Sequence, residues 1–166
     1  MKQPTLLIVG NPNVGKSVIF NKLTGSYAVV SNYPGTTVEL TKGTAKFDEC
    51  QFEVIDTPGA YSLLPITEEE RVTRAVLLEE KPEIVLHVID AKNLERMLSF
   101  TLQLIEAALP TMLVLNMMDE LERIGKKINL QALEKRLNIP VVGVVATTGR
   151  GIDVLKDRIA SYVAKN

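Results

Sequence analysis

The stretch Gly10-Asn11-Pro12-Asn13-Val14-Gly15-Lys16-Ser17 decides the fold of this chain. It matches the phosphate-loop pattern G-x-x-x-x-G-K-[S/T] and follows an apolar run at residues 6–9, as that pattern requires. Its glycines let backbone N–H groups turn inward, and a helix starting near Gly15 adds the positive end of its dipole. We therefore predict a nucleoside triphosphate site rather than an ordinary glycine turn. The predicted contacts come from Asn11, Asn13, Val14, Gly15, Lys16, Ser17 and the following Val18.

Two side chains of this loop have distinct expected roles. Lys16 is expected to reach the β- and γ-phosphates as a compact cation. The Ser17 hydroxyl is expected to bind Mg²⁺.

The composition predicts one aliphatic α/β domain over residues 1–166. The chain is 46% hydrophobic but only 5% aromatic, and Cys50 is its one cysteine, so it forms no internal disulfide. The net charge is −1 without a run of Lys and Arg, which argues against nucleic-acid binding. The chain has neither a long apolar window nor an N-terminal signal sequence, so we expect a soluble, cytosol-facing segment.

Apolar runs that alternate with helical periodicity predict a parallel sheet with helices on both faces. Two extended segments between residues 38 and 56 join near Asp48 and Glu49, too closely for a helical crossover, so they predict an antiparallel hairpin and one antiparallel edge strand. Thr67 and Glu70 have capping-box spacing and predict the start of a helix. The apolar runs that predict strands cover residues 6–9, 52–55, 84–89, 112–115 and 141–145.

Two further patterns predict buried positions. His87 is the one histidine, and it lies within the apolar run 84–89, which favours a core residue over a ligand. Apolar positions at helical spacing predict a helix face packed on the core. That face consists of Leu94, Met97, Leu98, Thr101, Leu102 and Ile105.

The motif Asp56-Thr57-Pro58-Gly59 follows a predicted strand, at the sheet edge where doubly wound folds bind their ligands. Asp56 is expected to hold Mg²⁺, through water, and the Gly59 N–H to contact the γ-phosphate. A plain turn would explain this motif in isolation, but its position after a phosphate loop favours the functional interpretation.

The motif Asn116-Met117-Met118-Asp119 follows the next-to-last predicted strand at the same edge. A carboxylate at Asp119 can accept hydrogen bonds from N1–H and the exocyclic N2–H of guanine, a pairing that adenine cannot offer. Asn116 is interpreted as a brace between this loop and the phosphate loop, and Met117 is counted among the nucleotide contacts. We therefore predict GTP and GDP as ligands.

Two further segments complete the predicted site. Ala146 and Thr147 follow the last strand, and their N–H groups are assigned to the guanine O6. Residues 25–39 are predicted to be mobile, because residues 32–37 within them are rich in turn residues and lack a helical or strand period. Thr36 and Thr37 lie in this segment, and Thr37 is favoured as the residue that closes over Mg²⁺ and the γ-phosphate.

These signatures occur in the order typical of the Ras-like translation-factor class of GTPases. More narrowly, G-N-P-N-V-G-K-S, N-Y-P-G-T-T-V-E, D-T-P-G-A-Y-S-L and N-M-M-D resemble the N-terminal G domain of the FeoB family of ferrous-iron transporters. Met117 replaces the lysine of the usual N-K-x-D motif, as in that family. The resemblance implies a three-layer P-loop NTPase G domain, with a six-stranded, mostly parallel sheet, one antiparallel edge strand and about five helices.

The resemblance also has implications for partners. It implies that the natural protein continues into a helical regulatory domain and a membrane domain, with this domain at the cytoplasmic face of the cell membrane. The domain would then be a GTP-hydrolysing switch that regulates or gates ferrous-iron transport. Formation of a homo-oligomer is left open.

The sequence predicts slow hydrolysis. Many related GTPases carry a water-orienting glutamine after D-x-x-G, but this position is Ala60. Residues 26–41 also contain no arginine or lysine that could act as a catalytic finger in cis. Asn13 resembles the asparagine with which FeoB relatives hold K⁺ against the phosphates, so a K⁺-stimulated GTPase is predicted; an Asx turn that braces the loop is the alternative. The predicted catalytic residues are Asn13, Lys16, Thr37 and Gly59.

Two other functions stay open at this point. One is a GTPase of the related group that acts on RNA or ribosome assembly, which shares the Asn-Pro-Asn-Val-Gly-Lys-Ser and Pro-Gly-Thr-Thr motifs. The near-neutral charge disfavours it. The other is a guanine-nucleotide sensor with negligible turnover.

Overall fold

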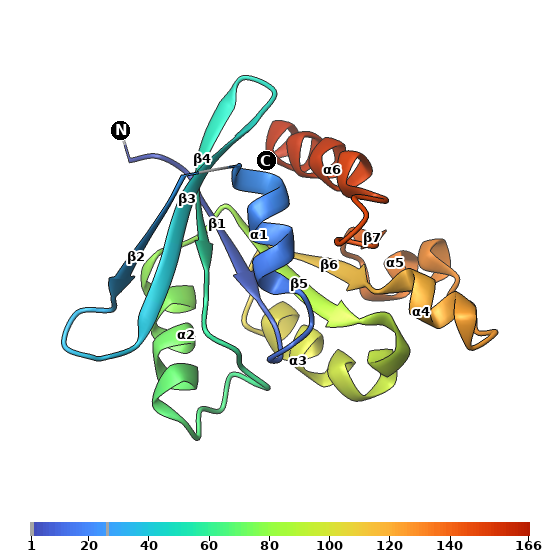
Figure 1. Cartoon of the computed structure of the whole chain (residues 1–166), viewed down its shortest axis with the longest axis horizontal. Helices are drawn as coiled ribbons and strands as arrows, with labels where there is room; N and C mark the ends of the chain where they lie inside the picture. Colours follow the sequence, from blue (N-terminus) through green and yellow to red (C-terminus); the bar gives the residue numbers. More distant parts are fainter. Residues whose placement is uncertain (1, 26) are drawn as a thin grey trace.

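A computed structural model describes residues 2–25 and 27–166, and in this part of the chain seven strands form one sheet in the order β2-β3-β4-β1-β5-β6-β7 (Figure 1). Neighbouring pairs are parallel from β4 to β7 and antiparallel from β2 to β4. The strands are β1 (Thr5–Val9), β2 (Ala28–Asn32), β3 (Glu39–Phe47), β4 (Cys50–Asp56), β5 (Ile84–Asp90), β6 (Thr111–Asn116) and β7 (Val141–Gly143).

Six α-helices and one 3₁₀ helix lie in the described residues. The predicted α/β fold is therefore confirmed, although it has one strand and one helix more than expected. The helices are α1 (Lys16–Thr24), α2 (Glu68–Glu79), η1 (Ala91–Asn93), α3 (Leu94–Glu106), α4 (Met118–Arg123), α5 (Leu130–Leu137) and α6 (Ile152–Lys165).

The additional strand is β2, which lies inside the segment predicted to be mobile and before most of its turn-rich residues 32–37. Its five residues are all exposed, so no alternation of buried and exposed positions marks it in the sequence. It forms because it pairs with β3 over five positions, from Ala28 with Gly43 to Asn32 with Glu39. β2 is thus an edge strand of the sheet. The antiparallel strand is β3, which lies next to the edge and not at it as predicted.

The predicted hairpin is present as β3 and β4. These strands pair from Thr41 with Asp56 to Phe47 with Cys50, and the connecting Asp48 has a positive φ of 52°. The hairpin places Asp56 at the end of β4, next to the end of β1 (Figure 1).

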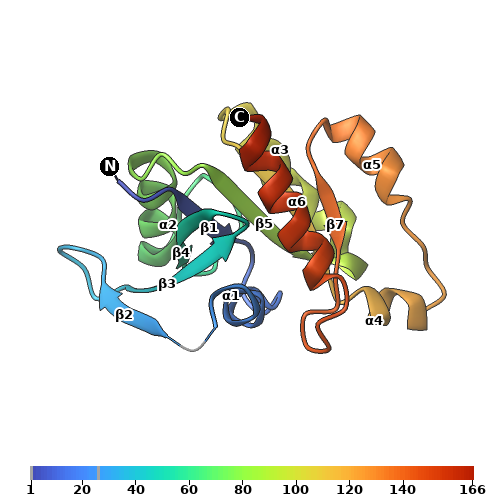
Figure 2. The same ribbon diagram turned by 90° about the horizontal axis from the view of Figure 1, so that it is seen from above.

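Alternate residues of β1 bury opposite faces of the sheet. Leu6 and Ile8 belong to a cluster that includes side chains of α1 and α6. Leu7 and Val9 belong to a second cluster with side chains of α2 and α3. The sheet is therefore the middle of three layers (Figure 2).

The ends of four parallel strands position the candidate site. β1, β4, β5 and β6 run in the same direction, so the segments that follow them meet at one edge of the sheet. Those segments are the phosphate loop, the Asp56–Gly59 motif, η1 and the Asn116–Asp119 motif. Across the described ranges, 2–25 and 27–166, we find no helix with the length and apolar character to cross a bilayer.

Candidate nucleotide-binding site

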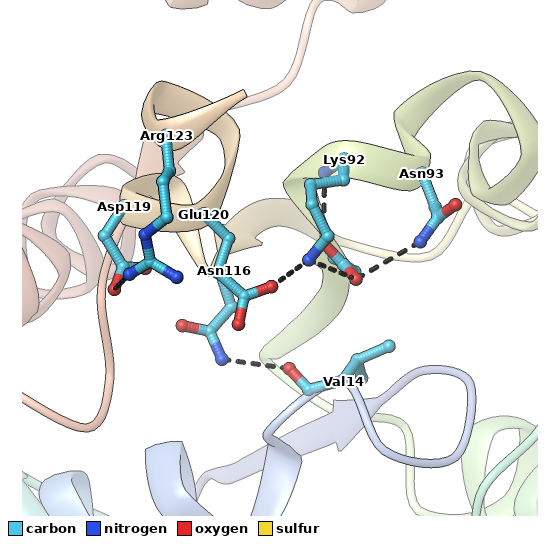
Figure 3. A network of polar contacts seen from close by, with 8 residues as sticks. Val14, Lys92, Asn93, Asn116, Asp119, Glu120 and Arg123 are labelled. Atoms are coloured by element: carbon cyan, nitrogen blue, oxygen red, sulfur yellow. Dashed lines mark hydrogen bonds and ion pairs between the residues drawn. The ribbon is translucent and has the colours of Figure 1, made fainter. Parts of the chain in front are cut away.

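The phosphate loop connects β1 to α1, and its geometry requires glycine at position 15. Gly15 has φ of 92°, and a Cβ there would come within 2.2 Å of the Asn116 Nδ2. Because Gly15 has no side chain, Asn116 can approach the loop, and its Nδ2 donates to the Val14 carbonyl over 2.9 Å (Figure 3). The brace predicted for Asn116 is therefore present as a hydrogen bond.

Asn13 also has a left-handed backbone, with φ of 65°. Its side chain is exposed and forms no hydrogen bond with any residue in the ranges 2–25 and 27–166, so no bracing Asx turn is seen. Instead, Asn13 lines a cavity that the phosphate loop shares with the Asn116–Asp119 motif.

The Ser17 hydroxyl and the Asp56 carboxylate face each other across the loop. Ser17 Oγ donates to Asp56 Oδ2 over 3.0 Å, whereas Asp56 Oδ1 is buried without a hydrogen-bond partner in the described structure. Burial raises the pKa of Asp56, against the opposing charge of Lys16 and the hydrogen bond from Ser17. An unpartnered carboxylate oxygen beside a hydroxyl is a donor set that suits a hard cation such as Mg²⁺.

The Asp56–Gly59 turn packs directly against the phosphate loop. The Ala60 N–H donates to the Gly10 carbonyl over 3.0 Å. A Cβ on Gly59 would lie 2.7 Å from the Pro12 Cγ, so the two turns touch where only glycine fits. The Thr57 hydroxyl secures the turn by donating to the Ile8 carbonyl over 2.8 Å.

A cavity of about 340 Å³ lies beside the phosphate loop. Asp119 lies at this cavity on α4, with its carboxylate 3.8 Å from the Arg123 guanidinium (Figure 3). Met117, which precedes α4, has a left-handed backbone with φ of 61°. The residues that line the cavity are Asn13, Gly15, Val18, Asn116, Met117, Asp119, Glu120, Val145 and Thr147.

The cavity brings together most of the predicted base and loop residues, but it corrects the role of Ala146. The Ala146 N–H donates to the Asn116 Oδ1 over 3.0 Å, and Ala146 is not among the cavity-lining residues. Its N–H is thus used in bracing, not presented to a base, while Thr147 does line the cavity. Glu120 and Val145 also line it and were not predicted; their only sequence signal is that they adjoin predicted residues.

The structure does not bring Thr36 and Thr37 to the phosphate loop. Thr36 Oγ1 donates to the Tyr33 carbonyl over 2.9 Å and accepts from the Val38 N–H over 3.1 Å, which closes a local turn. Thr37 is exposed. The Tyr33 hydroxyl donates to Glu79 of α2 over 2.7 Å, and the loop between β2 and β3 lies well away from the loop between β1 and α1 (Figure 1).

Comparison with known proteins identifies the family. The profile of the family described as Ferrous iron transport protein B matches residues 4–159. The chain belongs to this family. A Fe(2+) transport protein A/Fe(2+) transporter FeoB fusion protein of Porphyromonas gingivalis is 45% identical over 155 residues, which cover 93% of this chain. The chain spans only 18% of the length of that relative.

Solved structures of the family have the same fold. The FeoB G-domain from Methanococcus jannaschii superposes with a TM-score of 0.85 at 38% identity, and the match covers 99% of both chains. The cytosolic domain of the T. maritima FeoB iron transporter in a GDP form superposes with a TM-score of 0.94 at 36% identity. That match covers 99% of this chain and 65% of the other. The architecture is that of a FeoB G domain.

Proposed function

We propose that this chain is the GTP-binding and slowly GTP-hydrolysing switch domain of a ferrous-iron transporter. The observation that carries the proposal is the shared cavity, which joins the phosphate loop to the Asp119 helix at one edge of the sheet. Residues of the phosphate loop and Asp119 of α4 both line it. Family membership and the GDP form of a solved relative support guanine nucleotide as the ligand.

Base selection is assigned to Asp119. Its carboxylate can accept two hydrogen bonds from guanine, and a site built for this pairing rejects a base that lacks the donors. Thr147 is assigned to the guanine O6 through its backbone N–H, while Ala146 and Asn116 hold the surrounding loops in place.

Mg²⁺ is proposed to be held by Ser17 and Asp56, with Thr37 joining when GTP is bound. The buried, unpartnered Asp56 Oδ1 supports this assignment. When bound, the cation would neutralise charge on the β- and γ-phosphates. Lys16 would orient the same phosphates, and the Gly59 N–H would detect the γ-phosphate from its position against Pro12. Recruitment of Thr37 requires the β2–β3 loop to move from where it now lies.

Slow hydrolysis stimulated by K⁺ is proposed from two features. Ala60 is fully buried and carries no group that could orient water. The exposed Asn13 side chain lies at the wall of the cavity and forms no hydrogen bond with the residues that the structure describes. A cation held there would stabilise the charge that develops during phosphoryl transfer.

Single-turnover hydrolysis of GTP in matched KCl and NaCl buffers tests the enzymatic proposal. We expect the rate in K⁺ to exceed the rate in Na⁺ by about tenfold or more, and Asn13→Ala to remove the difference. Equal rates in the two salts would exclude the K⁺ proposal. Tight GDP binding without measurable turnover in either salt would favour a nucleotide sensor instead.

The wider role is proposed from the family. The domain is expected to lie at the cytoplasmic face of the cell membrane and to report its nucleotide state to a helical regulatory domain and a membrane transport domain of the same natural chain. The short share of the relatives' length that this chain spans supports a longer natural protein. Homo-oligomer formation is a further proposal, which analytical ultracentrifugation with GDP and with a non-hydrolysable GTP analogue would test.

A further inference from the structure

The helix that carries Asp119 is too short to fix its own position. α4 has six residues, and isolated helices of this length are unstable in water. Its N-cap residue, Met117, forms no side-chain hydrogen bond with the first turn, and of its six residues Leu121 is the buried one. The position of Asp119 must therefore depend on contacts between α4 and its neighbours.

Lys92 of η1 provides one such contact (Figure 3). Its ammonium forms an ion pair with Glu120 of α4 and lies 3.2 Å from both carboxylate oxygens of Asp90. Asp90 ends β5 and pairs in register with Asn116, which ends β6. Lys92 therefore joins the end of one central strand to the helix that follows the next.

One end of this bridge is well fixed. Asp90 also accepts hydrogen bonds from the Lys92 N–H over 3.0 Å and from Asn93 Nδ2 over 3.2 Å. The side chains of Asp90 and Lys92 are only 14% and 26% exposed, so water screens their attraction less than it would on an open surface. The hydrogen bond to Glu120 raises the pKa of Lys92 above its usual value, since the carboxylate favours the charged ammonium.

We propose that Lys92 is a positioning residue for base recognition, which holds α4 through Glu120 so that the Asp119 carboxylate faces the cavity. The inference rests on the proposed function, since it concerns how guanine is selected. Glu120 lines the same cavity as Asp119, and Met117 has no charge with which to hold the loop. Without Lys92, the carboxylates of Asp90 and Glu120 would repel each other and displace α4.

The affinities of GDP and inosine diphosphate separate positioning from general stability. Inosine diphosphate lacks the exocyclic amine, so it can donate only its N1–H to Asp119. Lys92→Met keeps the apolar stem and removes the charge. We expect GDP to bind about tenfold more weakly, and inosine diphosphate to lose less, so that the preference for GDP falls.

Three further variants complete the test. Lys92→Arg should restore the preference, because a guanidinium can reach both carboxylates. Lys126→Met is the matched control, since Lys126 is exposed and forms no ion pair within the described ranges; its preference should equal that of the unmodified chain. Glu120→Gln removes charge from the other end of the bridge and should lower the preference too, which keeps the proposal testable if Lys92→Met does not fold.

The outcomes are distinguishable. An unchanged preference in Lys92→Met, or equal losses for both nucleotides, would overturn the positioning role. An unmodified chain that binds ADP as well as GDP would instead overturn the proposed function, whatever the variants show.

Discussion

Asp119 is the residue on which nucleotide identity is proposed to depend. The variant Asp119→Asn replaces one acceptor oxygen by a donor, so it no longer matches guanine but does match xanthine, which has a carbonyl at the corresponding position. One guanine N–H loses its acceptor and meets a donor, and the carboxylate charge is lost, so GDP should bind about 100-fold more weakly while xanthosine diphosphate binds better. Titration calorimetry with both nucleotides measures this exchange. Unchanged GDP affinity would mean that the base lies elsewhere.

His87 is a core residue, as the sequence predicted. It is fully buried, with Nδ1 2.8 Å from the Thr101 hydroxyl and its ring packed edge-on to Phe100. Burial lowers the pKa of His87 to about 3, whereas in the unfolded chain it should be near 6.5. Below pH 6.5 the unfolded chain therefore binds a proton that the folded chain does not, and stability falls as the pH drops toward 3.

This linkage predicts a measurable pH dependence. Between pH 7 and pH 5, His87 should reduce the free energy of unfolding by about 2 kcal/mol. Urea titrations at the two pH values measure the loss. His87→Leu is expected to be less stable at pH 7, because Thr101 loses its partner, but to lack this part of the pH dependence. The same pH dependence in both proteins would contradict a neutral, buried His87.

At the scale of elements, α2 begins where the capping-box pattern predicted. Thr67 Oγ1 accepts from the Glu70 N–H over 3.1 Å, and Glu70 Oε1 accepts from the Thr67 N–H over 3.3 Å. Burial works to raise the pKa of Glu70, but hydrogen bonds from Thr67 and Tyr61 lower it overall. Glu70 thereby links the start of α2 to the turn that follows Gly59.

The cap gives an element-scale prediction. Thr67→Ala removes the acceptor for the Glu70 N–H and should lower the free energy of unfolding by about 1 kcal/mol. Thr67→Ser keeps the hydroxyl and should recover most of the loss. Chemical denaturation of the three proteins under identical conditions makes the comparison. Equal stability of the Ala and Ser variants would show that the cap contributes little.

In α3, the spacing of apolar residues did not fully predict which side chains are buried. The predicted face includes Leu102, yet this side chain is 44% exposed, while Phe100 and Leu104 are buried instead. Apolar residues occur around most of this helix, so the sequence pattern alone does not select one face. Packing against the sheet selects it, because Phe100 and Leu104 join the second core cluster with Leu7 and Val9 of β1.

At the scale of the whole molecule, the site lies between segments that follow separate strands, so a bound nucleotide should stabilise the entire fold. A ligand that binds only the folded chain, present at 100 times its Kd, adds about 2.7 kcal/mol. For a domain of this size, the melting temperature should rise by about 5–10 °C. Thermal unfolding with GDP, and with ADP as control, tests this. An equal rise with ADP would contradict guanine selection.

The sequence by itself determined the elements whose signals are local. The phosphate loop, the capping box at Thr67 and the apolar run around His87 can each be recognised in a short stretch of sequence, because their residue types and spacing are local. Those patterns predicted the α/β fold and most of the cavity lining.

Only the tertiary structure decided which segments distant in the chain contact each other. β2 exists because β3 pairs with it, and the Ala146 N–H is taken by Asn116. Lys92 reaches α4 only because β5 and β6 end side by side. These contacts join residues far apart in the chain, and no local pattern fixes the distance between them.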